Sequence, residues 1–261
     1  MGRHLTTHQA LTYCECPKKY YFRYVAKETP NYTQEHVRDM LSMRGWLAFL
    51  RNERKALGDV EGPKDLETAY ERIMDISVAT AISRTSHLLG DTEPLDAAQV
   101  VREELGRLAA LRMERAERHM RLYGLNGNLL GQIAYAPEDV ERRIVSFRHR
   151  TSGKVSLIKR DEGHATPIQV TSSVPPLGKA DIGGEIVAKI NAMLLREETG
   201  DDIPLSVVHY LRIHRTAHFS TGEGDKEVIK TFSEDVREAG TYHKREDGCP
   251  RCEFGEVCGR K

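Results

Sequence analysis

The stretch GKVSLIKRDEGHATPIQVT, residues 153–171, has the pattern of two strands joined by a turn. β-Branched and apolar residues are frequent in 153–160 and 166–173, and the charged segment DEGHA (161–165) separates them. The segment RRIVSFRHR, residues 142–150, has the same character and comes just before. The three segments together predict antiparallel or mixed strands connected by hairpins.

Helical patterns lie on both sides of these strands. Residues 5–27 predict two short helices around a cysteine corner, and longer helices are predicted at 40–57, 64–84 and 94–122. After the strands come a helix at 185–200 ended by Gly200, a strand at 205–214, a further strand around HFSTGE (218–223) and a helix at 225–239. This order indicates an α/β core with a helical insertion.

The composition favours a soluble globular protein that stays in a reducing cytoplasm. The chain has 261 residues, with 39 basic and 39 acidic side chains, so its net charge makes no case for a nucleic-acid or membrane partner. No stretch approaches the roughly 18 apolar residues of a membrane span, and the N-terminus lacks the apolar core of a signal peptide. In the cytoplasm, five cysteines are expected to be metal ligands or free thiols.

Three of these cysteines are close together near the C-terminus. The segment CPRCEFGEVC (249–258) has the spacing C-x2-C-x5-C, with Cys249, Cys252 and Cys258. Metal sites of this kind usually have four ligands. Of the two remaining cysteines, Cys16 precedes a proline and a helix start, where the helix dipole favours a thiolate. We therefore expect Cys16 to be the fourth ligand, with Cys14 as the alternative.

The spacing also bears on the kind of metal site. A zinc ribbon usually has two C-x2-C pairs, and this sequence has one. Three clustered cysteines with a distant fourth favour an iron–sulfur cluster, and zinc is the alternative. Three unrelated cysteines in a flexible tail are the remaining possibility.

The arrangement Cys16-Pro17-Lys18-Lys19-Tyr20, with the C-terminal cysteine trio and the strand order between them, resembles the iron–sulfur branch of the PD-(D/E)XK nuclease superfamily. This branch includes RecB- and AddB-type exonucleases and the CRISPR-associated Cas-four family. The resemblance implies a restriction-endonuclease-like mixed sheet and a 4Fe–4S cluster that fastens the two chain ends. It divides the chain into N-terminal helices (1–60), a helical insertion without a counterpart (61–125), a nuclease-like α/β core (126–240) and a C-terminal clasp (241–261).

The resemblance also implies where catalytic residues would stand. The family has an acid in a G-x-x-D strand, E-x-K in the next strand, a histidine in an N-terminal helix, and a Gln and a Tyr in the helix after the strands. The corresponding residues in this sequence are Ser156, Gln169, Thr171, Phe49, Val187 and Asn191. These residues supply no negative charge for Mg²⁺ or Mn²⁺. The sequence therefore predicts a nuclease-like frame without a catalytic centre or a catalytic metal.

A frame of this kind would act as a DNA-binding or scaffolding subunit of a DNA-processing or CRISPR-type nucleoprotein complex. Basic and aromatic residues together suit phosphate contacts and base stacking, with DNA favoured over RNA. The predicted nucleic-acid-binding residues are Lys18, Lys19, Tyr20, Arg23, Arg51 and Arg54. The alternative is that the aromatic rings are core and the charges merely solvated.

Two other functions stay open at this stage. One is a metal-dependent exonuclease with relocated acids, such as Asp161 and Glu162 in the turn after the first of the two strands. Ordinary turn chemistry is the alternative for those acids. The other function is a redox regulator that uses the cluster itself.

Overall fold

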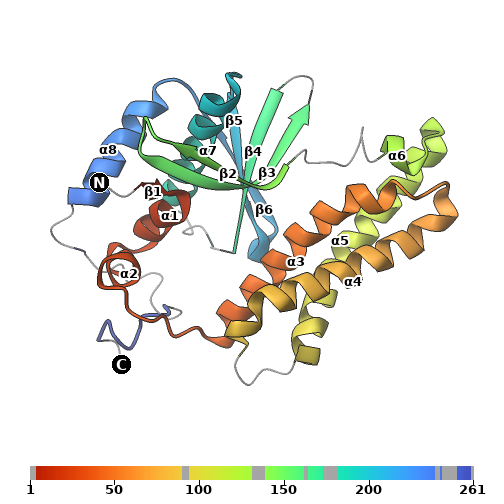
Figure 1. Ribbon diagram of the computed structural model, residues 1–261, viewed down its shortest axis with the longest axis horizontal. Helices are drawn as coiled ribbons and strands as arrows, with labels where there is room; N and C mark the ends of the chain where they lie inside the picture. Colours follow the sequence, from red (N-terminus) through yellow and green to blue (C-terminus); the bar gives the residue numbers. More distant parts are fainter. Residues whose placement is uncertain are drawn as a thin grey trace. The chain divides into compact units, whose positions relative to one another are not determined.

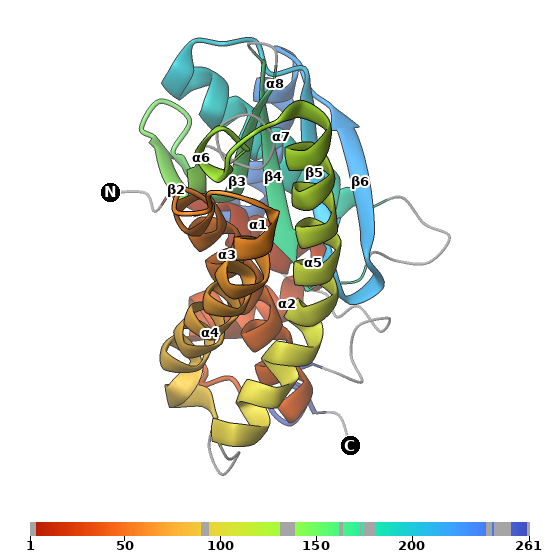
Figure 2. The same ribbon diagram turned by 90° about the vertical axis from the view of Figure 1, so that its right-hand side faces the viewer.

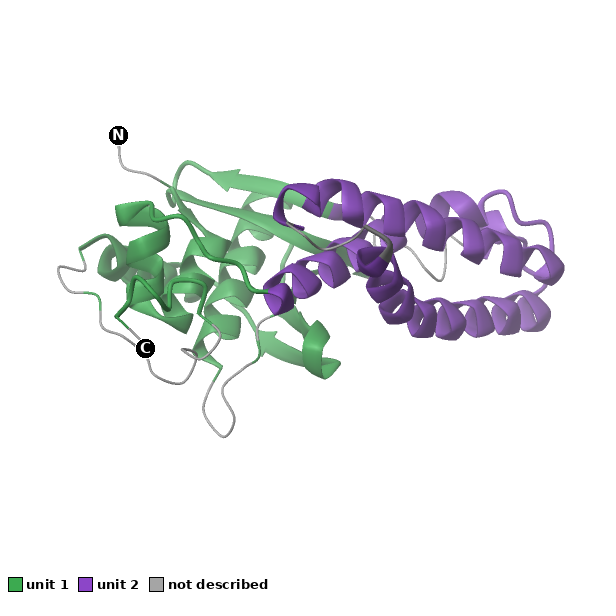
Figure 3. Cartoon of the chain, turned by 90° about the horizontal axis from the view of Figure 1, so that it is seen from below, with its two compact units in different colours: residues 1–33, 141–261 green, residues 34–140 purple. Residues whose placement is uncertain are grey.

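The computed structural model describes residues 4–89, 94–130, 139–161, 164–172, 174, 181–238, 242 and 252–259. The chain divides into two compact units, coloured separately in Figure 3. Unit 1 comprises 1–33 and 141–261, and unit 2 comprises 34–140. The domain boundary expected at 60/61 lies within unit 2, because the helix containing residues 40–57 belongs to that unit.

The described strands form one mixed sheet in the order β1-β3-β4-β5-β6, with β2 paired to β3. Their bounds are β1 Leu5–Thr6, β2 Asp139–Ser146, β3 Thr151–Asp161, β4 His164–Thr171, β5 Leu205–Tyr210 and β6 Arg215–Ser220. The pairs β1–β3 and β4–β5 are parallel, whereas β3–β4 and β5–β6 are antiparallel. The predicted mixed α/β architecture is therefore confirmed. The strands are labelled in Figure 1.

The hairpin predicted from the opening stretch is present as β3 and β4. Its register runs from Leu157 opposite Ile168 to Asp161 opposite His164, and residues 162–163 lie outside the described residues. Val155 and Ile158 of β3 are both at most 1% exposed, which explains the nearly continuous apolar run in the sequence.

Two strand predictions extended too far. The segment 147–150 is a turn rather than the end of a strand, and Arg150 has a φ of 49°. Likewise, the chain leaves β5 at Tyr210 and makes the short 3₁₀ turn η5 (Leu211–Ile213), which ends at His214 with a φ of 48°. Left-handed residues of this kind interrupt extended backbone.

Helix α7 (Ile182–Thr199) is the central helix of unit 1. Asp181 caps its N-terminus by accepting a 2.9 Å hydrogen bond from the Gly184 N–H. Gly200, with a φ of 76°, ends it. The helix packs on β3, β4 and β5 and contacts α1 (Thr7–Glu15) and α8 (Asp225–Glu238), so its apolar residues form the core of the unit (Figure 1).

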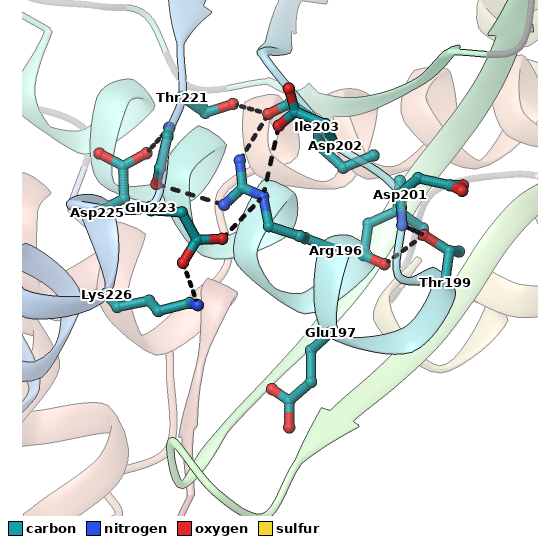
Figure 4. A network of polar contacts seen from close by, with 12 residues as sticks. Arg196, Glu197, Thr199, Asp201, Asp202, Ile203, Thr221, Glu223, Asp225 and Lys226 are labelled. Carbon is teal, nitrogen blue, oxygen red and sulfur yellow. Dashed lines mark hydrogen bonds and ion pairs between the residues drawn. The ribbon is translucent and has the colours of Figure 1, made fainter.

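A buried arginine joins the end of α7 to two loops. The Arg196 side chain is 10% exposed, and its guanidinium donates hydrogen bonds to the carbonyl oxygens of Ile203 (2.8 Å) and Gly222 (3.3 Å) (Figure 4). Thr221 Oγ1 also donates to the Ile203 carbonyl. Arg196 therefore fixes the chain before β5 and before α8, at the opposite end of α7 from Asp181.

Unit 2 is helical. Its main helices, α3, α4 and α5, pack side by side, as Figure 2 shows. The bounds are α3 Gln34–Leu57, η2 Pro63–Asp65, α4 Leu66–Thr85, η3 Ser86–Leu88, α5 Pro94–Tyr123 and α6 Gly127–Leu130. Buried Glu53 of α3 accepts hydrogen bonds from Tyr70 Oη (2.7 Å) and Arg112 Nε (2.7 Å), which ties the three helices together. Across the described residues, no helix is both long and apolar enough to span a membrane.

Candidate functional site

The structure brings three of the six expected catalytic positions into one hydrogen-bonded group. Ser156 lies on β3, Gln169 on β4 and Asn191 on α7. Gln169 Nε2 lies 3.0 Å from Ser156 Oγ, and Asn191 Nδ2 lies 3.1 Å from Gln169 Oε1. Ser156 is 5% exposed and Asn191 is fully buried. We call this group the neutral triad, because none of its side chains can carry a charge.

Ser156 and Gln169 use their hydrogen bonds within the neutral triad and on the adjoining backbone, whereas Asn191 Oδ1 is buried without a hydrogen-bond partner among the described residues. Ser156 Oγ accepts from Gln169 Nε2 and also from the Val170 N–H at 3.0 Å, so both of its lone pairs are occupied. Gln169 Nε2 donates a second bond to the Val170 carbonyl at 3.1 Å. A divalent cation would have to displace these bonds and would gain no negative charge from the ligands.

The other three expected positions are also uncharged and buried. Thr171 is 7% exposed at the end of β4, and Val187 is 2% exposed on α7. Phe49 is fully buried in unit 2, where its ring lies 6.0 Å from that of Tyr70. None of the three therefore supplies a charge or an exposed ligand for a divalent cation.

No second centre of acids that could hold a metal ion forms within the described residues. Asp181 is occupied as the cap of α7 and accepts a hydrogen bond from Tyr210 Oη. Burial raises its pKa, against the opposing effect of the Gly184 N–H. Asp161 ends β3, and Glu162 lies outside the described residues.

Cys16 occupies the corner that the sequence predicted. Its backbone is extended, with φ −164° and ψ 114°, between α1 and α2 (Pro17–Tyr20), and Pro17 takes the first helical position. The following residues widen into a turn of π-helix, η1 (Tyr21–Ala26). Cys14 is 8% exposed and packs in the core of unit 1, whereas Cys16 is half-buried.

The C-terminal cysteines approach this corner. Cys252 and Cys258 are half-buried free thiols on a turn that lies beside α2 and η1 (Figure 1). Burial raises the pKa of the Cys252 thiol, against the opposing effect of the Phe254 N–H. Cysteine thiolates are ligands that iron and zinc accept.

The complete four-cysteine site cannot be traced in the described residues, because Cys249 lies outside them. Among the residues that are described, no three Cys, His, Asp or Glu side chains gather closely enough to hold a metal ion. The described contact between the two chain ends is made by Lys19 and Arg23, which follow Cys16 and pair with Glu253, the residue after Cys252.

Glu253, which the sequence did not single out, is the buried centre of this region. Its side chain is 1% exposed and is ion-paired with Lys19 Nζ (3.3 Å) and with Arg23 Nη2. Lys19 also pairs with Glu15 at 2.9 Å. Burial opposes the charge of Lys19, but the two carboxylates outweigh it and raise the lysine pKa.

The residues predicted to bind nucleic acid have varied positions. Lys19 and Arg23 pair with Glu253, and Tyr20 packs against the aromatic rings of Tyr13, Tyr24 and Tyr242. Lys18 Nζ lies 5.9 Å from the centre of the Phe22 ring. Arg51 and Arg54 are exposed on α3 and belong to unit 2. Of the six residues, Lys19 and Arg23 therefore join the N-terminal segment to the C-terminal turn.

The comparisons with known proteins add little to this description. No family model matches the sequence, and no curated protein matches it at a significant level. A crystal structure of the protein SSO0001 is similar at a TM-score of 0.34 and 15% identity, over 56% of this chain and 81% of that one. A likeness of this size does not establish a shared fold.

Proposed function

We propose that this chain is a catalytically inactive, nuclease-like iron–sulfur protein that acts in the cytoplasm as a scaffolding or DNA-binding subunit of a DNA-processing or CRISPR-type nucleoprotein complex. The neutral triad is the observation that carries the proposal. Ser156, Gln169 and Asn191 stand where the resemblance would place an acid, an acid and a tyrosine, and they bond to one another. The frame keeps the positions together while lacking the charge that cleavage needs.

The cysteines support the second part of the proposal. Cys16, Cys252 and Cys258 would hold the 4Fe–4S cluster together with Cys249. In this role the cluster is a structural clasp, because its ligands come from opposite ends of the chain and closing a long loop restricts the unfolded chain most. The neighbouring ion pairs of Glu253 strengthen the same connection.

The distribution of positive charge favours scaffolding over DNA binding. Lys19 and Arg23 are about four-fifths buried and already neutralise Glu253, so a phosphate contact would have to break those pairs. Other protein subunits are therefore the principal expected partners, and DNA contacts would have to come from exposed residues such as Arg51 and Arg54.

The proposal is tested by purifying the chain anaerobically and incubating it with single- and double-stranded DNA in Mg²⁺ or Mn²⁺. We expect no cleavage by the protein. Robust metal-dependent cleavage that co-elutes with the protein and is abolished by Asp161→Ala would overturn the proposal in favour of relocated catalytic residues.

A DNA-binding measurement separates the two roles. Fluorescence anisotropy with labelled DNA at low and physiological salt should give weak binding that disappears as salt is added. Binding that persists at physiological salt, and whose affinity falls when Arg51 and Arg54 are changed to alanine, would assign the DNA-binding role instead.

A further inference from the structure

The C-terminal turn is held by an acid that stands between two of the expected metal ligands. Glu253 follows Cys252 directly, and its side chain is 1% exposed. A carboxylate in such a position is stable only when cations and hydrogen-bond donors surround it. Lys19 and Arg23 supply them from α2 and η1, more than 200 residues earlier in the chain.

The backbone and the next side chain add contacts that involve no cysteine. The Asn31 N–H donates a 2.9 Å hydrogen bond to the Glu253 carbonyl oxygen. The Phe254 ring is 1% exposed and stacks on Phe22, with the ring centres 5.8 Å apart. The Arg23 guanidinium carbon lies 5.9 Å from the centre of the same Phe254 ring, so one arginine contacts both residues.

These contacts join the two chain segments that carry the expected cluster ligands. Lys19 and Arg23 follow Cys16 on the same helical segment, and Glu253 follows Cys252. The ion pairs therefore hold the segment that contains Cys252 against the segment that contains Cys16. Glu256 lies on the same turn, but its side chain is exposed, unlike the buried side chain of Glu253.

We propose that Glu253 is a positioning residue that docks the C-terminal turn onto α2 and η1 without any metal, so that the segments with Cys16 and Cys252 are held against each other before a cluster binds. The docked turn then keeps the segment with Cys252 against the segment with Cys16, and loss of the cluster does not release the turn. This inference rests on the proposed iron–sulfur function only for the cluster, because the docking itself depends on protein contacts alone.

The test uses the full chain, purified anaerobically, in its metal-loaded form and after removal of metal by a chelator under reducing conditions. Hydrogen–deuterium exchange of residues 252–259 reports docking, and iron content per chain reports the site. In the wild-type apoprotein the turn should stay protected. Glu253→Gln should raise its exchange by about tenfold or more and lower the bound iron, since it removes the buried charge that Lys19 and Arg23 require.

Glu256→Gln is the matched control, because it removes the same charge from an exposed position in the same turn, and it should behave as the wild type. Arg23→Gln acts from the opposite segment and should free the turn as Glu253→Gln does, which keeps the test informative if one variant folds poorly. Far-UV circular dichroism checks the fold of each variant.

Two results would overturn the inference. The first is an apoprotein whose turn exchanges as freely as that of Glu253→Gln, which would mean that the metal does the docking. The second is a Glu253→Gln protein with wild-type protection and iron content. If the wild type binds no iron but its turn is protected in a Glu253-dependent manner, the docking stands and the iron–sulfur part of the proposed function fails.

Discussion

Replacing Ser156 by alanine removes the hydroxyl group at the centre of the neutral triad. Ser156 Oγ accepts 3.0 Å hydrogen bonds from the Val170 N–H and from Gln169 Nε2. Gln169 keeps its other bond, to the Val170 carbonyl at 3.1 Å, so the principal loss is a buried backbone donor left without this acceptor. An unsatisfied buried donor costs about 1–3 kcal/mol, and we therefore expect Ser156→Ala to lower the free energy of unfolding by about 2 kcal/mol.

Ser206→Ala is the matched control on the neighbouring part of the sheet. Ser206 is fully buried, but its hydroxyl makes one longer bond, 3.3 Å to the Pro167 carbonyl oxygen. Its removal should cost about 1 kcal/mol or less.

Urea denaturation followed by far-UV circular dichroism measures both variants, with the midpoint compared at a common slope. Hydrogen exchange of a peptide covering residues 168–172 should also become faster in Ser156→Ala alone. If Ser156→Ala stays within about 0.5 kcal/mol of the wild type, or matches Ser206→Ala, the triad does not act as a linked structural element.

Three further predictions concern stability. Arg112→Met leaves the buried carboxylate of Glu53 without its guanidinium and should destabilise unit 2 by about 3–5 kcal/mol in urea unfolding; a loss below about 1 kcal/mol would contradict the buried pair. Gly106→Ala, in the middle of α5 where an added Cβ meets nothing within 4 Å, should raise the melting temperature by the equivalent of about 1 kcal/mol, and a lowered value would contradict that open environment. Burial and the nearby Arg23 charge lower the pKa of His8 below its ordinary 6.5, so its contribution to stability is complete above pH 6.5 and is lost as the pH falls toward the folded-state pKa. The urea midpoint should accordingly fall between pH 7.5 and 5.5 more steeply in the wild type than in His8→Asn, and equal slopes would argue against the shift.

Much of the fold followed from local sequence signals. The strands were predictable because apolar and β-branched runs are bounded by Gly and charged turns, and the end of α7 was predictable because Gly200 follows it. Residues 147–150 were misassigned because Phe147 and its basic neighbours continue the strand pattern, while the turn depends on Arg150 adopting a positive φ.

The candidate site was only partly predictable, for a different reason. The frame of glycine, strand, turn and strand indicated Ser156 and Gln169, and the cysteine spacing indicated Cys16. Glu253 was missed because its burial depends on Lys19 and Arg23, which are distant in the sequence. The four-residue spacing of these two cations places them on one face of the segment, where their mutual repulsion needs a compensating charge, but the sequence does not say which acid supplies it.

The most direct test of the central claim, a nuclease-like frame without a catalytic metal site, is a Mn²⁺ titration followed by electron paramagnetic resonance. The wild type is compared with Ser156→Asp/Gln169→Glu, in which two carboxylates replace neutral members of the triad. We predict no stoichiometric binding by the wild type, and one bound Mn²⁺ per chain, with a raised melting temperature, in the double variant. Stoichiometric Mn²⁺ binding by the wild type, or a folded double variant that binds none, would contradict the claim.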